Sequence, residues 1–203
     1  MARSTLLFSL MCLSFLYVPS QSASAATTTA AAINPATTNF IKNSCKATTY
    51  PTVCFQSLSP YASAINKSPR QLVSTALTVS VDRAQSTKTF VAKLNKIHGL
   101  KPKEYAALKD CLEEISDSAD RLSKSVRELK NMGSARGPEY SWHMSNLQTW
   151  VSAALTDESS CMDGFSGRAM DGRIKSSIRA RMTNVAQVTS NALALCNHFS
   201  GKY

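Results

Sequence analysis

Residues 102–132, PKEYAALKDCLEEISDSADRLSKSVRELKNM, decide the fold of this chain. Apolar side chains recur there at steps of three and four residues, at Tyr105, Leu108, Leu112, Ile115, Ala119, Leu122, Val126 and Leu129. That spacing places them on one face of an α-helix. Pro102 is typical of a first helical turn and Gly133 of a helix end. The segment is therefore predicted to be one long amphipathic helix.

Three further segments carry the same periodicity. One begins at the capping motif Ser68-Pro69-Arg70-Gln71 and is expected to end near Gly99. The other two span about Met144–Phe165, where Glu158 interrupts the apolar positions, and Ile174–Phe199. Four helices of roughly 27 to 31 residues with short connections predict an all-α, up-down-up-down four-helix bundle. Residues 39–66 are shorter and more broken, and we expect an N-terminal helical hairpin there.

The N-terminus predicts secretion. Arg3 precedes an apolar run from Thr5 to Val18, and the small residues Ala23-Ser24-Ala25 are typical of a cleavage site. The run is shorter than the ~20 apolar residues that span a bilayer. We expect a signal peptide at 1–25, a flexible tail at 26–38 and one domain at 39–203.

The composition favours a folded, non-catalytic protein. Apolar residues make up 43% of the 203 residues and charged residues 18%, which is enough to build a core. His98, His143 and His198 lie in unrelated segments, none beside a nucleophile motif, and the sequence has no Cys-x-x-Cys. We therefore expect no catalytic residue, no metal and no cofactor.

Five cysteines remain once the signal peptide, which contains Cys12, is removed. In an oxidising compartment an even number should pair, and spacing alone permits several pairings. A bridge from Cys45 to Cys54 would close the hairpin, and one from Cys111 to Cys161 would tie two neighbouring helices. Cys196 falls on the apolar face of the last helix, which favours a buried, inert thiol over a reactive one.

Several motifs resemble those of the plant invertase/pectin methylesterase inhibitor family. They are Cys45-x-x-Thr48-x-Tyr50-Pro51-x-x-Cys54, Ala107–Glu113 (ALKDCLE), Trp150–Phe165 (WVSAALTDESSCMDGF) and Ser190–Leu195 (SNALAL). The resemblance runs from about Phe40 to Phe199. It implies a four-helix bundle with an N-terminal hairpin, disulfides Cys45–Cys54 and Cys111–Cys161, and a free fifth cysteine.

The same resemblance implies a function. Members of this family inhibit enzymes without doing chemistry themselves, and the motifs are more similar to those of pectin methylesterase inhibitors. Invertase inhibitors usually carry a Pro-Lys-Phe tripeptide, which does not occur here. We expect a secreted, monomeric inhibitor that blocks the substrate cleft of pectin methylesterase in the cell wall or apoplast, with acid invertase as the alternative target. No nucleic-acid or membrane partner is expected.

Charge is unevenly distributed. The chain carries 23 Lys and Arg against 13 Asp and Glu, a net charge of +10 that predicts weak, salt-sensitive attraction to polyanionic pectin. Residues 102–132 nevertheless hold seven of the acids: Glu104, Asp110, Glu113, Glu114, Asp117, Asp120 and Glu128.

Some of these acids are candidates for partner contact. Glu113, Asp117 and Asp120 share a stripe facing away from the apolar side. The resemblance implies enzyme contacts for this stripe, and for Ser160, where the family usually has Thr, and Asp163. The alternative is a solvated face on which Lys124 pairs with Asp120. For Gln148 and Ser152, also candidates, a role without partner contact is favoured.

Asn66-Lys67-Ser68 is a sequon for N-glycosylation at Asn66. Pro69 follows it directly, which often lowers use of the sequon. Ser68 is also the expected helix cap, so occupancy is left open.

Overall fold

The computed structural model describes residues 34–170 and 172–201, except for the side chain of Ala169. The predicted signal peptide, with Cys12, and residues 26–33 of the predicted tail lie outside these residues. Helices account for all of the regular structure described: α1 (Pro35–Cys45), α2 (Pro51–Leu58), the 3-10 turn η1 (Ser59–Tyr61), α3 (Ala62–Ile65), α4 (Pro69–Leu94), α5 (Pro102–Met132), α6 (Gly137–Asp163), the 3-10 turn η2 (Arg168–Met170) and α7 (Arg173–Ser200). The predicted all-α class is confirmed.

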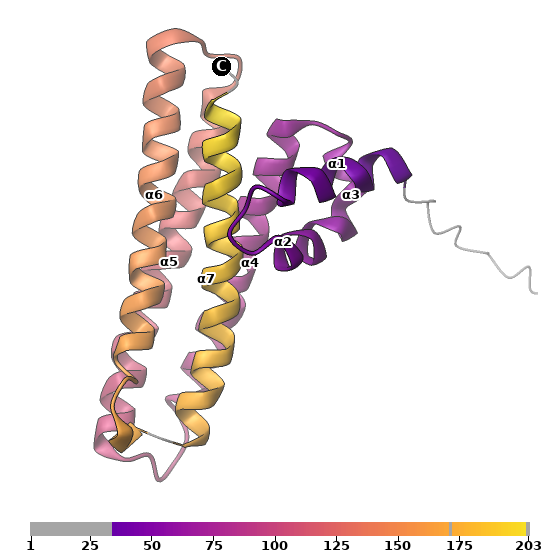
Figure 1. Cartoon of the computed structure of the whole chain (residues 1–203). Helices are drawn as coiled ribbons and strands as arrows, with labels where there is room; N and C mark the ends of the chain where they lie inside the picture. The colour runs from indigo at the N-terminus through magenta and orange to yellow at the C-terminus, as the bar shows by residue number, and fades with distance from the viewer. Residues whose placement is uncertain (1–33, 171, 202–203) are drawn as a thin grey trace, which may run out of the picture. The chain divides into compact units, whose positions relative to one another are not determined.

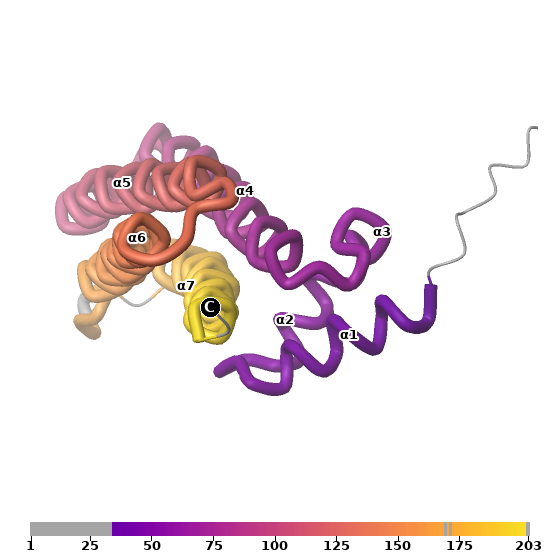
Figure 2. The backbone as a smooth tube through the Cα atoms, turned by 90° about the horizontal axis from the view of Figure 1, so that it is seen from above, coloured from indigo at the N-terminus to yellow at the C-terminus, as the bar shows by residue number. Residues whose placement is uncertain are grey.

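Helices α4–α7 form the predicted bundle (Figure 1). Their short connections make successive helices antiparallel, and each helix packs against two others, in the cycle α4, α5, α6, α7. Viewed along the bundle in Figure 2, α1–α3 lie to one side, against α4 and α7. The hairpin thus leaves the outer faces of α5 and α6 uncovered.

The core contains the apolar positions that the periodicity selects. Leu108, Ile115 and Leu122 of α5 are fully buried, as are Leu147 of α6 and Ile178 of α7. Tyr105, which fits the same periodicity, is instead 51% exposed. It lies in the first turn of α5, close to the end of the bundle, where fewer neighbouring side chains cover it.

Local capping sets two helix boundaries that differ from expectation. Helix α1 begins at Pro35, inside the segment expected to be a flexible tail, because the Asn34 side chain accepts a hydrogen bond from the backbone N–H of Ala36 at 2.9 Å. Helix α4 ends at Leu94 rather than near Gly99. Asn95 forms its C-cap, and Gly99 lies in the following loop with a φ of +82°.

Two disulfides connect these elements, in the pairings that the family resemblance implies. Cys45–Cys54 joins α1 to α2, and Cys111–Cys161 joins α5 to α6. Cys196 is a buried free thiol, and burial raises its pKa to about 12. At physiological pH this cysteine is therefore an unreactive core residue.

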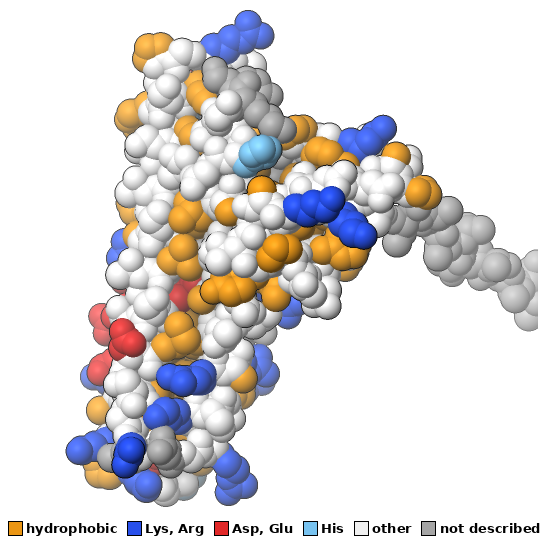
Figure 3. All heavy atoms as spheres, in the orientation of Figure 1, with side chains coloured by type: hydrophobic (Ala, Val, Ile, Leu, Met, Phe, Trp, Pro, Cys, Tyr) orange, Lys and Arg blue, Asp and Glu red, His pale blue; other side chains and the backbone are white. Residues whose placement is uncertain are grey.

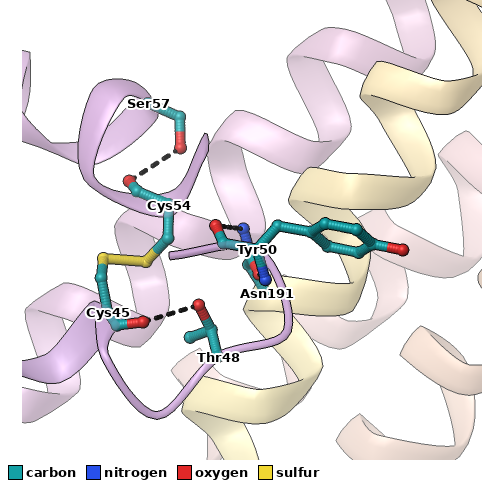
Figure 4. Close-up of a disulfide and its surroundings, with 6 residues drawn as sticks. All are labelled: Cys45, Thr48, Tyr50, Cys54, Ser57 and Asn191. Atoms are coloured by element: carbon teal, nitrogen blue, oxygen red, sulfur yellow. Dashed lines mark hydrogen bonds between the residues drawn. A yellow bond between two sulfur atoms is a disulfide. The ribbon is translucent and has the colours of Figure 1, made fainter. Parts of the chain in front are cut away.

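Side-chain hydrogen bonds attach the disulfide loop of the hairpin to α7. The Asn191 amide accepts a hydrogen bond from the Tyr50 backbone N–H at 2.9 Å and donates one to the Tyr50 carbonyl at 3.0 Å (Figure 4). Within the loop, the Thr48 hydroxyl donates to the Cys45 carbonyl at 2.8 Å. The two Asn191 bonds attach the hairpin to the bundle.

Candidate partner-binding face

The candidate face lies along the outer side of α5 and α6. Cys111 and Cys161 bring the two helices to a Cα–Cα separation of 4.2 Å. Glu113 is two residues beyond Cys111, and Ser160 directly precedes Cys161. Because each residue advances a helix by about 1.5 Å, both lie within one turn of the bridge. The disulfide thus holds candidate residues from two helices at the same level of the bundle.

Most of the predicted contact residues are exposed on this face. Glu113, Asp117 and Asp120 point away from the core of α5, and Ser152, Ser160 and Asp163 are exposed on α6. Gln148 is different, because its side-chain amide donates a hydrogen bond to the Asn197 side chain at 2.9 Å. That bond connects α6 to α7, and a role of Gln148 without partner contact stays a prediction.

An ion pair that sequence reasoning missed lies beside the stripe. Arg121 Nε of α5 is 2.7 Å from Asp157 Oδ2 of α6, and Arg121 Nη2 is 3.9 Å from Asp117 Oδ2. One guanidinium thus connects the exposed Asp117 to the buried Asp157.

Around Arg121, the carboxylate groups outnumber the cations. Burial raises the pKa of Glu114, and the charges of Asp157, Asp117 and Glu113 raise it further, in that order. Burial likewise raises the pKa of Asp157, although Arg121 opposes the change. We call Glu113, Glu114, Asp117 and Asp157 the acidic patch. Figure 3 shows acidic side chains gathered at the lower left edge of the bundle, in a view where the charged side chains are mostly Lys and Arg.

Lys124 does not make the pairing that sequence reasoning considered for it. Its Nζ atom lies over the ring of Trp150, 4.5 Å from the ring centroid, rather than at Asp120. A cation over an indole face is electrostatically favourable, which accounts for this choice. Among the residues that the structure describes, Asp120 therefore has no ion pair and keeps its charge exposed to solvent.

Beneath the acidic patch, Glu158 is buried in the core of the bundle with no exposed surface. Its Oε1 accepts hydrogen bonds from the Ser118 hydroxyl of α5 at 2.8 Å and the Thr189 hydroxyl of α7 at 2.9 Å. Burial raises its pKa to about 7. The sequence pattern revealed Glu158 as an interruption among apolar positions but predicted no role for it.

The His143 side chain contacts a carboxylate of the neighbouring helix. His143 Nδ1 lies 2.8 Å from Glu128 Oε2, which ties α6 to α5. Within residues 34–170 and 172–201, no group of three or more His, Cys, Asp or Glu side chains could hold a metal ion. No helix in this part of the chain has the length and apolarity of a membrane span.

Asn66 is exposed at the C-cap of α3, in the left-handed conformation with a φ of +42°. The hydroxyl of Ser68 accepts a hydrogen bond from the Gln71 backbone N–H at 3.3 Å. Ser68 is therefore the cap of α4, as expected, and glycosylation at Asn66 stays a prediction.

Comparisons with known proteins give a consistent result. Residues 39–195 match the family described as plant invertase/pectin methylesterase inhibitor. The chain is 58% identical to the 21 kDa protein of Daucus carota, over 81% of this chain and 85% of that protein. It is also 58% identical to pectinesterase inhibitor 11 of Arabidopsis thaliana, over 81% and 82% of the two chains. The crystal structure of a mutant pectin methylesterase inhibitor from Arabidopsis has the same fold, with a TM-score of 0.61 at 22% identity over 75% of this chain and 92% of that one.

Proposed function

Because this chain belongs to the plant invertase/pectin methylesterase inhibitor family, we propose that it inhibits pectin methylesterase. It does so as a stoichiometric, non-covalent partner that covers the substrate cleft of the enzyme. The observation that carries this proposal is the exposed acidic stripe next to the Cys111–Cys161 bridge, in a relative of named pectinesterase inhibitors. No residue of this chain takes part in a reaction.

The contact surface consists of Glu113, Asp117 and Asp120 on α5 together with Ser160 and Asp163 on α6. Support comes from their exposure and from the disulfide that holds the two helices together. A surface that is rigid before binding loses little conformational freedom on docking. Its negative charge, within a chain of net charge +10, selects a partner with a positive rim beside its cleft. Ser152 lies at the margin of this surface, and Gln148 does not contribute to it.

The site of action is the plant cell wall, where the protein is secreted and works as a monomer. Its positive charge adds a weak attraction to polyanionic pectin. Arg168, Arg173 and Arg179 are exposed at the start of α7 and in the loop before it, at one end of the bundle. Salt screens such attraction, so it serves localisation rather than inhibition.

Parallel assays test the proposed target. Purified mature protein is titrated into a plant pectin methylesterase and into an acid invertase, each at low salt and at ~0.2 M salt. We expect loss of methylesterase activity at a one-to-one ratio that persists at the higher salt, with invertase unaffected. Inhibition of invertase alone, or inhibition of methylesterase that salt abolishes, would refute the proposal.

A further inference from the structure

Glu158 has an environment that suits a neutral carboxylic acid. The side chain is fully buried at the junction of α5, α6 and α7, and its only hydrogen bonds come from the hydroxyls of Ser118 and Thr189. Both bonds reach Oε1, and Oε2 has no hydrogen-bond partner among the residues that the structure describes. An ionised carboxylate offers about four acceptor sites and, when buried, requires a cation or several donors. Two neutral donors on one oxygen fall well short of this.

In the described part of the chain, no cation forms an ion pair with Glu158. On its own helix, the neighbouring charged group is Asp157, whose negative charge disfavours a second one. On α5, Arg121 pairs with Asp157 and Asp117. The buried polar side chains of α7 are Thr189 and Asn191, and those of α4 are Ser80 and Thr87, all uncharged. Among the residues that the structure describes, the buried polar side chains of α4 and α7 are therefore neutral, and the charge that acts on Glu158 is the negative one of Asp157.

We propose that Glu158 is a proton-dependent lock of the bundle, which holds α5, α6 and α7 together when protonated and loosens them when it ionises. The hydroxyls of Ser118 and Thr189 can donate to the carboxyl group or accept its proton, so both groups remain satisfied in the acid form. Ionisation leaves an uncompensated charge in the core. The inference concerns the fold and does not rest on the proposed function.

The direction of the pH dependence follows from linkage. Burial raises the pKa of Glu158 from 4.5 to about 7, so the folded chain keeps a proton that the unfolded chain releases. Stability from this group is therefore greatest below about pH 4.5, decreases as pH rises toward 7, and levels off above that. An acidic solution favours the folded bundle, and a neutral or alkaline one weakens it.

The test compares urea unfolding of the wild type with that of Glu158→Gln between pH 5 and 8. Gln keeps the shape and can hydrogen-bond both hydroxyls, but it cannot ionise. We expect the unfolding equilibrium constant of the wild type, relative to that of the variant, to rise on the order of fifty- to a hundredfold from pH 5 to pH 8. The control Asp120→Asn, which removes an exposed acid, should leave the wild-type pH profile unchanged. Identical pH profiles for the wild type and Glu158→Gln would overturn the proposal.

If the Glu158→Gln variant fails to fold, the ionisation of Glu158 can be measured directly in the native protein. NMR titration of native protein labelled with ¹³C at the glutamate side chains reports the ionisation of each carboxyl group. We expect one glutamate resonance to titrate near neutral pH, and the variant Thr189→Val to shift that resonance, which assigns it. Ionisation of all glutamates by pH 5.5 would contradict the proposal.

Discussion

Asp157 and Glu158 are neighbours in the chain, yet their carboxyl groups have different surroundings in the bundle. Asp157 lies 2.7 Å from the Arg121 guanidinium and belongs to the acidic patch on the outer side of α5 and α6. Glu158 points into the core, where two hydroxyls bind it and no cation reaches it. One turn of α6 thus carries two buried carboxyl groups, one paired with a cation and one bound by hydroxyls. Burial raises the pKa of both, and Arg121 opposes the rise at Asp157.

Removing the disulfide between α5 and α6 should have the largest effect on the free energy of unfolding. Replacing Cys111 and Cys161 together by Ala opens a loop with a sequence separation of 50, which costs about 4 kcal/mol in the chain-entropy treatment. Urea unfolding under oxidising conditions measures this loss. The core and the acidic patch should both be affected, because the bridge fixes α5 against α6. A loss below about 1 kcal/mol would show that packing alone sets their alignment.

Removing Arg121, the cation paired with Asp157, should have the next largest effect on the free energy of unfolding. Arg121→Ala leaves the buried Asp157 without its counter-ion, and we expect a loss of about 1–3 kcal/mol in the free energy of unfolding. The loss should be smaller in acid, because a protonated Asp157 does not need the cation. Urea unfolding at pH 5 and at pH 8 measures both values. A pH-independent loss would mean that Arg121 acts through packing instead.

Lys124→Ala is the matched control for that experiment. Lys124 is a cation on the same helix, but it contacts the ring of Trp150 rather than a carboxylate. We expect a loss of only about 0.5–1 kcal/mol, without pH dependence.

Among the changes made at acidic groups, the smallest effect is expected at Glu158, and its pH dependence is the informative part. Thr189→Val removes one of the two donors to Glu158, at a cost of about 1 kcal/mol. The cost should be larger at pH 8 than at pH 5, because the ionised carboxylate needs that donor more than the neutral acid does. Thermal unfolding at the two pH values measures the difference. A larger cost in acid would contradict the assignment of a neutral Glu158.

Local patterns in the sequence predict much of this molecule. The apolar spacing in residues 102–132 defines α5, and the capping motif at Ser68 defines the start of α4. The same periodicity places position 158 on the buried side of α6. The two disulfides follow from the family resemblance, because spacing alone allows several pairings.

The remaining features depend on how separate helices align. The Arg121–Asp157 pair forms only when α5 and α6 are antiparallel in a particular register, and the Tyr50–Asn191 bonds join residues 141 positions apart. Lys124 had two partners within reach, and its choice of Trp150 over Asp120 depends on the position of a ring from α6. Short-range patterns contain no information on these distances.

We propose that the acidic stripe of α5 contacts pectin methylesterase, and the dissociation constant of the complex measures the strength of this contact. It is measured between pH 5 and pH 7.5 for the wild type, for Asp117→Asn, and for Asp82→Asn, which removes an exposed acid on α4. Protonation of Glu114 and Asp157, whose pKa values are raised, should weaken wild-type binding toward pH 5, because it lowers the negative charge beside the contact. We predict that Asp117→Asn binds more weakly than the wild type at pH 7.5 and loses part of the pH dependence, whereas Asp82→Asn behaves as the wild type. Equal dissociation constants and equal pH profiles for Asp117→Asn and the wild type would contradict the account.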